Sequence, residues 1–253
     1  MGGKNSEWFF DENFWEQFAP IMFDSAHWQE VPAVADSILR LAGLKPGRKV
    51  LDLCCGFGRV SAELARRGLA VTGVDITESY LATAAEEAAY EKLKIDYVKA
   101  DARDFEVPAF FDAAVNLYIS FGYFENPDDD KLLLRNVFNS LKPGGVFIIE
   151  TLGKEMAARD FVVSDSFERA GLKIFTEYEV LDSWGFLKNR WLLLKEDRVI
   201  EKTFSQRLYC ASELRRILLE TGFCEIKLFG DWDESPYDHR AAKLIAVGKK
   251  PKA

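Results

Sequence analysis

Two glycines and an aspartate in the first half of the chain have the type and spacing to hold a cofactor. Asp52 lies inside a short apolar segment, and Gly56 and Gly58 follow it closely. Glycine lets the backbone approach a ligand, and the start of the next helix presents N–H groups without partners. Asp75 closes the next apolar segment, about 20 residues beyond, where a carboxylate can accept bonds from both ribose hydroxyls. The pattern predicts a nucleotide-type cofactor site.

The elements that would position these residues alternate between strand and helix. Short apolar runs predict strands, and apolar residues at helical spacing predict helices. This alternation indicates a doubly wound, mostly parallel seven-stranded α/β sheet with helices on both faces. The predicted strands are 49–53, 70–74, 95–99, 111–117, 146–150, 225–229 and 243–247, with helices at 31–44, 61–67, 78–92, 129–141 and 212–220.

The pattern changes after residue 170. Segments 172–181, 186–194 and 198–209 look like three strands joined by short turns, which connect antiparallel neighbours. We therefore expect a small antiparallel β-sheet inserted in the main domain. The predicted division is an N-terminal helical lid segment at 1–45, a cofactor-binding domain at 46–151 and 210–250, and an inserted substrate region at 152–209.

Five segments occur in the order of a known motif set. The first is Val50-Leu51-Asp52-Leu53-Cys54-Cys55-Gly56-Phe57-Gly58-Arg59, and the others are Val74-Asp75-Ile76, 99–103, 111–117 and 141–145. Together they resemble class I S-adenosylmethionine (SAM)-dependent methyltransferases of the small-molecule type. Cys54 stands where that family has the first of three glycines. The resemblance, over roughly residues 45–150, implies a Rossmann-like fold, SAM as cofactor and methyl transfer as the reaction.

The resemblance also implies roles for single residues. Asp52 would lie near the methionine amino group of SAM, and Asp75 would hold the ribose. Ile76 would pack on the adenine face. The remaining cofactor contacts would come from the loop residues Cys54, Gly56 and Gly58, from Asp101 and Ala102 beside the adenine, and from Asn116 and Leu117 beside the methionine end.

The methyl acceptor would bind beyond the carboxyl ends of the strands, as ligands do in sheets of this kind. Aromatic residues reach that edge from the loop after the fourth strand and from the N-terminal segment. An arginine at the end of the inserted sheet could anchor a carboxylate. The predicted substrate-binding residues are Phe14, Phe18, Tyr118, Phe121, Arg207, Tyr209 and Trp232.

The chemistry of methyl transfer favours a nitrogen acceptor here. A neutral amine attacks without a base, so that the enzyme supplies positioning and water exclusion. A hydroxyl acceptor needs a base, and neither His27 nor His239 sits in a recognisable catalytic pair. No catalytic residue is assigned. Two alternatives stay open: an NAD-dependent oxidoreductase, because Gly56-x-Gly58-x-x-Ser61 partly fits the dinucleotide fingerprint, and a non-catalytic SAM-binding protein.

Composition limits the partners. The net charge of −8 has the wrong sign for tracking a phosphate backbone, so a small-molecule acceptor is expected and nucleic acid is not. The four cysteines form no Cys-x-x-Cys pair, so no metal site is predicted. We find neither a 20-residue apolar run nor a secretion signal, and therefore expect no membrane association and a cytoplasmic location. A homodimer is a further open expectation.

Overall fold

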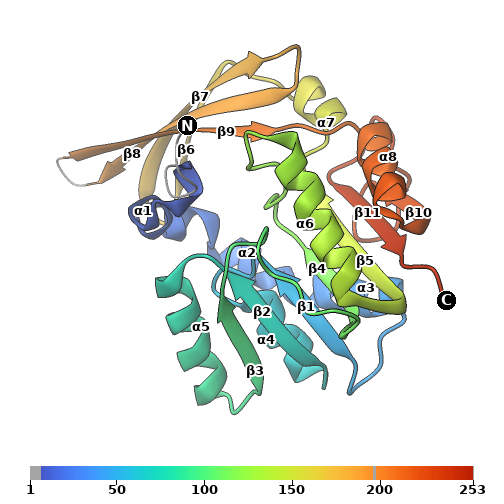
Figure 1. Ribbon diagram of the computed structural model, residues 1–253. Coiled ribbons are helices and arrows are strands. Elements are labelled where there is room, and N and C mark those ends of the chain that lie inside the picture. Colours follow the sequence, from blue (N-terminus) through green and yellow to red (C-terminus); the bar gives the residue numbers. More distant parts are fainter. Residues whose placement is uncertain (1–6, 196–197, 253) are drawn as a thin grey trace.

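The computed structural model describes residues 7–195 and 198–252. Its main element is a seven-stranded sheet in the order β10-β11-β5-β4-β1-β2-β3 (Figure 1). Every neighbouring pair is parallel except those of β11, which runs antiparallel to β5 and β10. The predicted seven-stranded, mostly parallel sheet is therefore confirmed.

The strands of this sheet are β1 (Lys49–Leu53), β2 (Ala70–Asp75), β3 (Ile95–Lys99), β4 (Phe111–Asn116), β5 (Leu141–Thr151), β10 (Cys224–Phe229) and β11 (Leu244–Lys249). The helices are α1 (Glu12–Met22), α2 (Ser25–Gln29), α3 (Val31–Ala42), α4 (Arg59–Arg66), α5 (Glu78–Tyr90), α6 (Pro127–Ser140), α7 (Lys154–Arg159) and α8 (Ala211–Thr221), with a 3-10 turn at Trp8–Phe10.

Alternate residues of the central strands face opposite sides of the sheet, and each side has its own apolar core. Leu51 and Leu53 of β1 belong to the core beneath α6 and α8. Val50 belongs to the core beneath α3 and α4. This burial on both faces explains the continuous apolar strands in the sequence. None of the helices in the described residues has the length and apolar character of a membrane span.

A second, four-stranded sheet stands above the carboxyl ends of the main strands (Figure 1). It consists of β6 (Ser164–Arg169), β7 (Leu172–Leu181), β8 (Phe186–Lys195) and β9 (Arg198–Arg207), all antiparallel. The predicted inserted antiparallel sheet is confirmed. The sequence missed β6, because this edge strand is polar and mostly exposed and carries no apolar pattern.

The N-terminal segment joins the two sheets. Phe14, Phe18 and Ile21 of α1 form a buried cluster with Ile174 and Leu193 of the antiparallel sheet. In contrast, α3 packs on the main sheet. We therefore propose that the lid ends before α3 and includes the 3-10 turn, α1 and α2. The first six residues of the predicted 1–45 segment lie outside the described residues.

Candidate functional site

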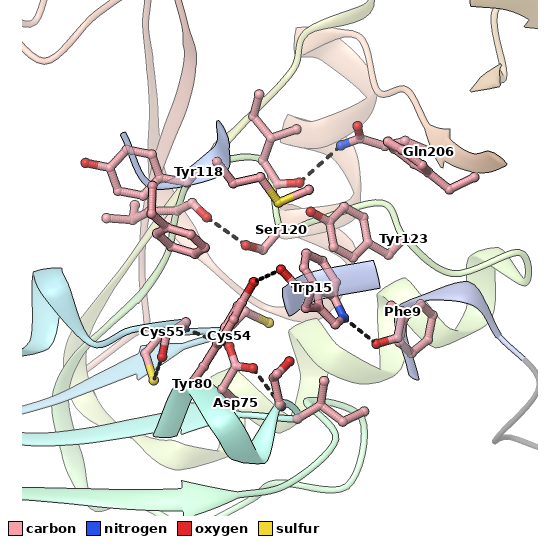
Figure 2. A pocket seen from close by; sticks show the side chains of 18 of the residues that line it. Phe9, Trp15, Cys54, Cys55, Asp75, Tyr80, Tyr118, Ser120, Tyr123 and Gln206 are labelled. Atoms are coloured by element: carbon pink, nitrogen blue, oxygen red, sulfur yellow. Dashed lines mark hydrogen bonds between the residues drawn. The ribbon is translucent and has the colours of Figure 1, made fainter. Parts of the chain in front are cut away.

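One cavity of about 590 Å³ lies at the carboxyl ends of β1, β2 and β4, beneath α1 and the antiparallel sheet. Figure 2 shows Asp75 and Cys54 on one side of it, Tyr118 and Gln206 across from them, and Trp15 between. Eight predicted cofactor residues line it, namely Asp52, Cys54, Gly56, Asp75, Ile76, Asp101, Ala102 and Leu117.

The loop after β1 has left-handed backbone at three positions. Cys54, Gly56 and Gly58 have φ values of 61°, 55° and 69°. The left-handed conformation costs a residue with a Cβ about 1–2 kcal/mol. Cys54 therefore has the backbone conformation that suits glycine, and its backbone is strained. Burial raises the pKa of the Cys54 thiol, with Asp75 adding to the shift. The thiol therefore stays protonated and serves as a small apolar surface.

Asp75 is oriented by the loop that faces it. Its Oδ2 accepts a 2.8 Å hydrogen bond from Gly56 N, and its Oδ1 accepts a 2.9 Å bond from Thr77 N. Burial raises the pKa of this carboxyl, and the backbone bonds oppose the shift. Gly56 also leaves room for the lid, since a Cβ there would come within 3.0 Å of the Phe23 ring.

Asp52 lies deeper, at 3% exposure. The hydroxyl of Ser61 on α4 donates a 2.6 Å hydrogen bond to its Oδ2. Burial first, and then the neighbouring Asp75, raise the pKa of Asp52 to about 6, against the bond from Ser61. The carboxylate therefore changes charge near neutral pH.

Gly58 and Asn116, two of the predicted cofactor residues, do not line the cavity. A Cβ on Gly58 would come within 2.2 Å of the Tyr97 hydroxyl, so glycine is needed there for packing. Asn116 is fully buried, and its Nδ2 donates a 3.0 Å bond to the backbone carbonyl of Leu53. Both residues support the loop from behind.

Asp101 is paired with a buried arginine. Nε and Nη2 of Arg103 both donate to the carboxylate, with the shortest contact at 2.6 Å. The same guanidinium contacts Glu7, before the lid helix, at 2.7 Å and Asp129 of α6 at 3.1 Å. The loop that carries Asp101 is thereby tied to the lid.

Aromatic side chains of the lid form much of the cavity wall. Trp8 lies 4.7 Å from Tyr123 and 4.8 Å from Phe204 between ring centres. Trp15 donates through its Nε1 to the carbonyl of Phe9 at 2.7 Å. All five line the cavity, as does the predicted Phe14. Only Phe14 and Phe18 of this aromatic stretch were predicted to contact the acceptor, because helical spacing alone does not distinguish wall residues from core residues.

Five of the seven predicted substrate residues do not line the cavity, and these assignments need correction. Phe18 is fully buried against Trp191 and Phe14 in the core between lid and sheet. Trp232 packs in the core under α3, where its carbonyl accepts bonds from Ser37 and Arg40.

The other three form a buried support for the loop after β4. The Tyr209 hydroxyl donates a 2.7 Å bond to Asp130, which Arg207 also approaches at 3.3 Å. Phe121 is fully buried and packs on Tyr209, with ring centres 5.3 Å apart. Arg207 therefore pairs with a carboxylate of this chain rather than presenting itself to an acceptor. Tyr118 does line the cavity.

His27 lines the cavity as well, and its partner could not be predicted from the sequence. Its Nδ1 lies 2.6 Å from Oδ1 of Asp24, which also caps α2 by accepting a bond from His27 N. Because Nδ1 of His27 is paired with Asp24, Nε2 is the ring nitrogen that can interact with another group. The expectation that neither histidine has a catalytic-type partner is wrong for His27. His239 is 85% exposed.

The sequence and the fold are similar to those of known methyltransferases. A family model described as "Methyltransferase domain" matches residues 50–145, the range that carries the cofactor loop and the strands around it. Residues 50–145 therefore form a methyltransferase domain, and the relatives and solved structures described below support a SAM-dependent methyltransferase of class I, with SAM as the cofactor.

Two curated relatives show how far the sequence similarity extends. "Putative methyltransferase YqeM" of Bacillus subtilis (strain 168) is 26% identical over 222 residues, which are 83% of this chain and 87% of that protein. The ubiquinone biosynthesis O-methyltransferase of Pseudomonas fluorescens (strain Pf0-1) is 33% identical over 119 residues. That match covers 46% of this chain and 50% of the relative, so about half of the O-methyltransferase is represented.

Solved structures share the fold over nearly the whole chain. A SAM-dependent methyltransferase from Clostridium acetobutylicum ATCC 824 has a TM-score of 0.77 at 16% identity, covering 94% of this chain and 98% of that one. The sugar N-methyltransferase KedS8 from Streptoalloteichus sp ATCC 53650 has 0.66 at 18%, covering 100% and 96%. SAM-bound CalS10, an amino pentose methyltransferase from Micromonospora echinaspora, has 0.68 at 18%, covering 93% and 96%.

Proposed function

We propose that this enzyme methylates a nitrogen atom of a small molecule whose body is largely apolar. The observation that carries the proposal is the single cavity in which the cofactor residues and an aromatic chamber are continuous. Its volume of about 590 Å³ lies within the roughly 300–1,000 Å³ of pockets that enclose small ligands. The cytoplasmic location and the homodimer stay predictions.

The residue assignments for SAM follow from the geometry of the loop after β1. Asp75 is held by two backbone donors with its carboxylate at the cavity wall, an arrangement that suits the two ribose hydroxyls. Ile76 and Ala102 would contact the adenine. Asp52 would face the methionine ammonium, beside Leu117.

The acceptor chamber is built mainly of rings. Its lining includes Trp8 and Phe14 of the lid, Tyr123 of the loop after β4, and Trp191 and Phe204 of the antiparallel sheet. Bound SAM supplies an electrophilic methyl group on a positively charged sulfur, and aromatic faces stabilise such a cation. The same rings exclude water, which keeps a neutral amine unsolvated for attack.

Nitrogen is favoured because a neutral amine needs positioning rather than a strong base. The structural likeness to the sugar N-methyltransferase KedS8 and the amino pentose methyltransferase CalS10 supports this choice. A methyl-transfer screen with labelled SAM tests it, using primary and secondary amines beside alcohols of the same skeleton. We expect product from amines. Turnover of alcohols alone would contradict the proposal.

A second candidate function is O-methylation, and the His27–Asp24 pair is the observation that favours it. A histidine held by a carboxylate can accept the proton of a hydroxyl group during attack. The sequence similarity to O-methyltransferases points the same way. The variant His27→Asn replaces the imidazole ring by an amide and distinguishes O-methylation from N-methylation. Hydroxyl methylation should fall at least a hundredfold in this variant, whereas amine methylation should change little.

A further inference from the structure

Arg59, the first residue of α4, is a buried cation at the cavity wall. It is 4% exposed and belongs to the lining. Its Nη1 donates to the backbone carbonyl of His27, and its guanidinium carbon lies 3.6 Å from the centre of the Tyr118 ring. Within residues 7–195 and 198–252, no carboxylate comes within 4.0 Å of its nitrogens, and Nη1 is the one nitrogen that forms a hydrogen bond.

A second buried arginine shows how different this situation is. Arg103 is also 4% exposed, but three carboxylates, those of Glu7, Asp101 and Asp129, surround it. Buried charges are normally paired, because removing a charge from water is expensive. Arg59 instead keeps donors toward the cavity while its nearest negative groups act from a distance. Such a guanidinium is a receptor for an anionic group of a ligand.

The position of Arg59 identifies that group. It follows Gly58 directly, so it stands at the same loop as Asp52, which faces the amino-acid end of SAM in the proposed orientation. That end carries an ammonium and a carboxylate side by side. We infer that Arg59 binds the α-carboxylate of SAM and thereby makes the enzyme select SAM over its decarboxylated form. This inference rests on the orientation given under the proposed function.

Calorimetry with two ligands and three proteins tests the inference without any turnover. The ligands are SAM and decarboxylated SAM, which differ only in the carboxylate. The proteins are the wild type, Arg59→Gln and the control Arg66→Gln. Arg66 lies on the same helix with a 40% exposed side chain and pairs with Glu63 and Glu91, away from the cavity. The control therefore makes the same charge change outside the site.

We expect the wild type and Arg66→Gln to bind SAM at least tenfold more tightly than decarboxylated SAM. Decarboxylated SAM lacks the carboxylate and therefore cannot form the charge-assisted bond to Arg59. Arg59→Gln should bind both ligands with similar affinity, near that of the wild type for decarboxylated SAM. Because Arg59 is buried, thermal melting confirms that the variant folds. If Arg59→Gln does not fold, Arg59→Lys replaces it in the test. Lysine keeps the charge but lacks the planar guanidinium, so this variant should keep part of the preference for SAM over decarboxylated SAM.

Two results would overturn the inference. One is a wild type that binds both ligands equally, and the other is an Arg59→Gln protein that keeps the preference for SAM. The second result would indicate that Arg59 binds a carboxylate of the acceptor instead of the carboxylate of SAM. If the wild type bound no SAM at all, the cofactor orientation would fail together with this inference, whereas SAM binding without preference overturns the inference alone.

Discussion

The hydroxyl of Tyr80 on α5 donates a 2.6 Å hydrogen bond to the backbone carbonyl of Trp15 on α1. Figure 2 shows this bond beside Asp75, at the cofactor side of the cavity. The Tyr80 ring also packs on Phe57 and Phe23, at 4.1 Å and 5.5 Å between ring centres. One tyrosine thus fastens the lid to the domain that holds the cofactor.

Tyr80→Phe should loosen the lid while leaving the ring packing intact. A typical hydrogen bond contributes about 0.5–1.5 kcal/mol, so we expect SAM to dissociate roughly 2- to 12-fold faster. Stopped-flow release of the cofactor measures this. Tyr90→Phe is the matched control, because Tyr90 ends the same helix at 90% exposure. Equal release rates in the two variants would show that the bond does not hold the lid.

Asp75→Asn should weaken SAM binding at least tenfold. The amide keeps one acceptor for Gly56 or Thr77 but loses the charge that strengthens the proposed ribose bonds. Calorimetry with SAM and with its demethylated product should show the same loss for both, since both carry the ribose. Asp96→Asn, at an exposed position on β3, should bind normally. Wild-type affinity in Asp75→Asn would mean that the ribose lies elsewhere.

The affinity for SAM should depend on pH through Asp52. A carboxyl whose pKa is raised to about 6 is charged above that pH, so its attraction for an ammonium is present at pH 7 and lost as pH falls below 6. We expect the dissociation constant to rise roughly tenfold between pH 7 and pH 5, given about 1.4 kcal/mol for a single lost charge interaction. Asp52→Asn should bind weakly and with a flatter profile. A profile of wild-type steepness in that variant would assign the titration to another group.

Cys54→Gly should stabilise the protein. The change removes about 1–2 kcal/mol of left-handed strain and costs about 0.5–1 kcal/mol in backbone entropy, so the melting temperature should rise by about 1–3 °C. Cys54→Ser retains the Cβ and should give no such gain. A melting temperature that falls in Cys54→Gly would show that thiol packing outweighs the strain.

The features that depend on short stretches of sequence, namely the strands, the helices and the glycine loop, could be predicted. The alternation of strands and helices along the chain follows from apolar runs, and the loop around Gly56 follows from glycine; the structure has both. Which aromatic side chain faces the cavity depends on contacts between segments far apart in the chain. Phe14 and Phe18 share one helix face and sit in one cluster, yet Phe14 alone lines the cavity.

The polar pairs were harder still to foresee. Arg207 looked available for a substrate carboxylate, but Asp130, far away in the sequence, lies 3.3 Å from it. His27 looked isolated, but the turn before α2 brings Asp24 to its ring. Arg59 is part of the first motif, but no role was predicted for it. The sequence shows neither its burial nor the lack of a paired carboxylate among the described residues.

The core shared by α1 and the antiparallel sheet has a consequence for changing what the enzyme accepts. Phe14, Phe18 and Ile21 pack against Ile174 and Leu193, so α1 and the antiparallel sheet meet in one packed interface although residues 46–151 of the cofactor-binding domain separate them in the chain. Transplanting β6–β9 from another methyltransferase without its own α1 would join mismatched surfaces. Acceptor preference should therefore be inherited and redesigned as a matched pair of segments.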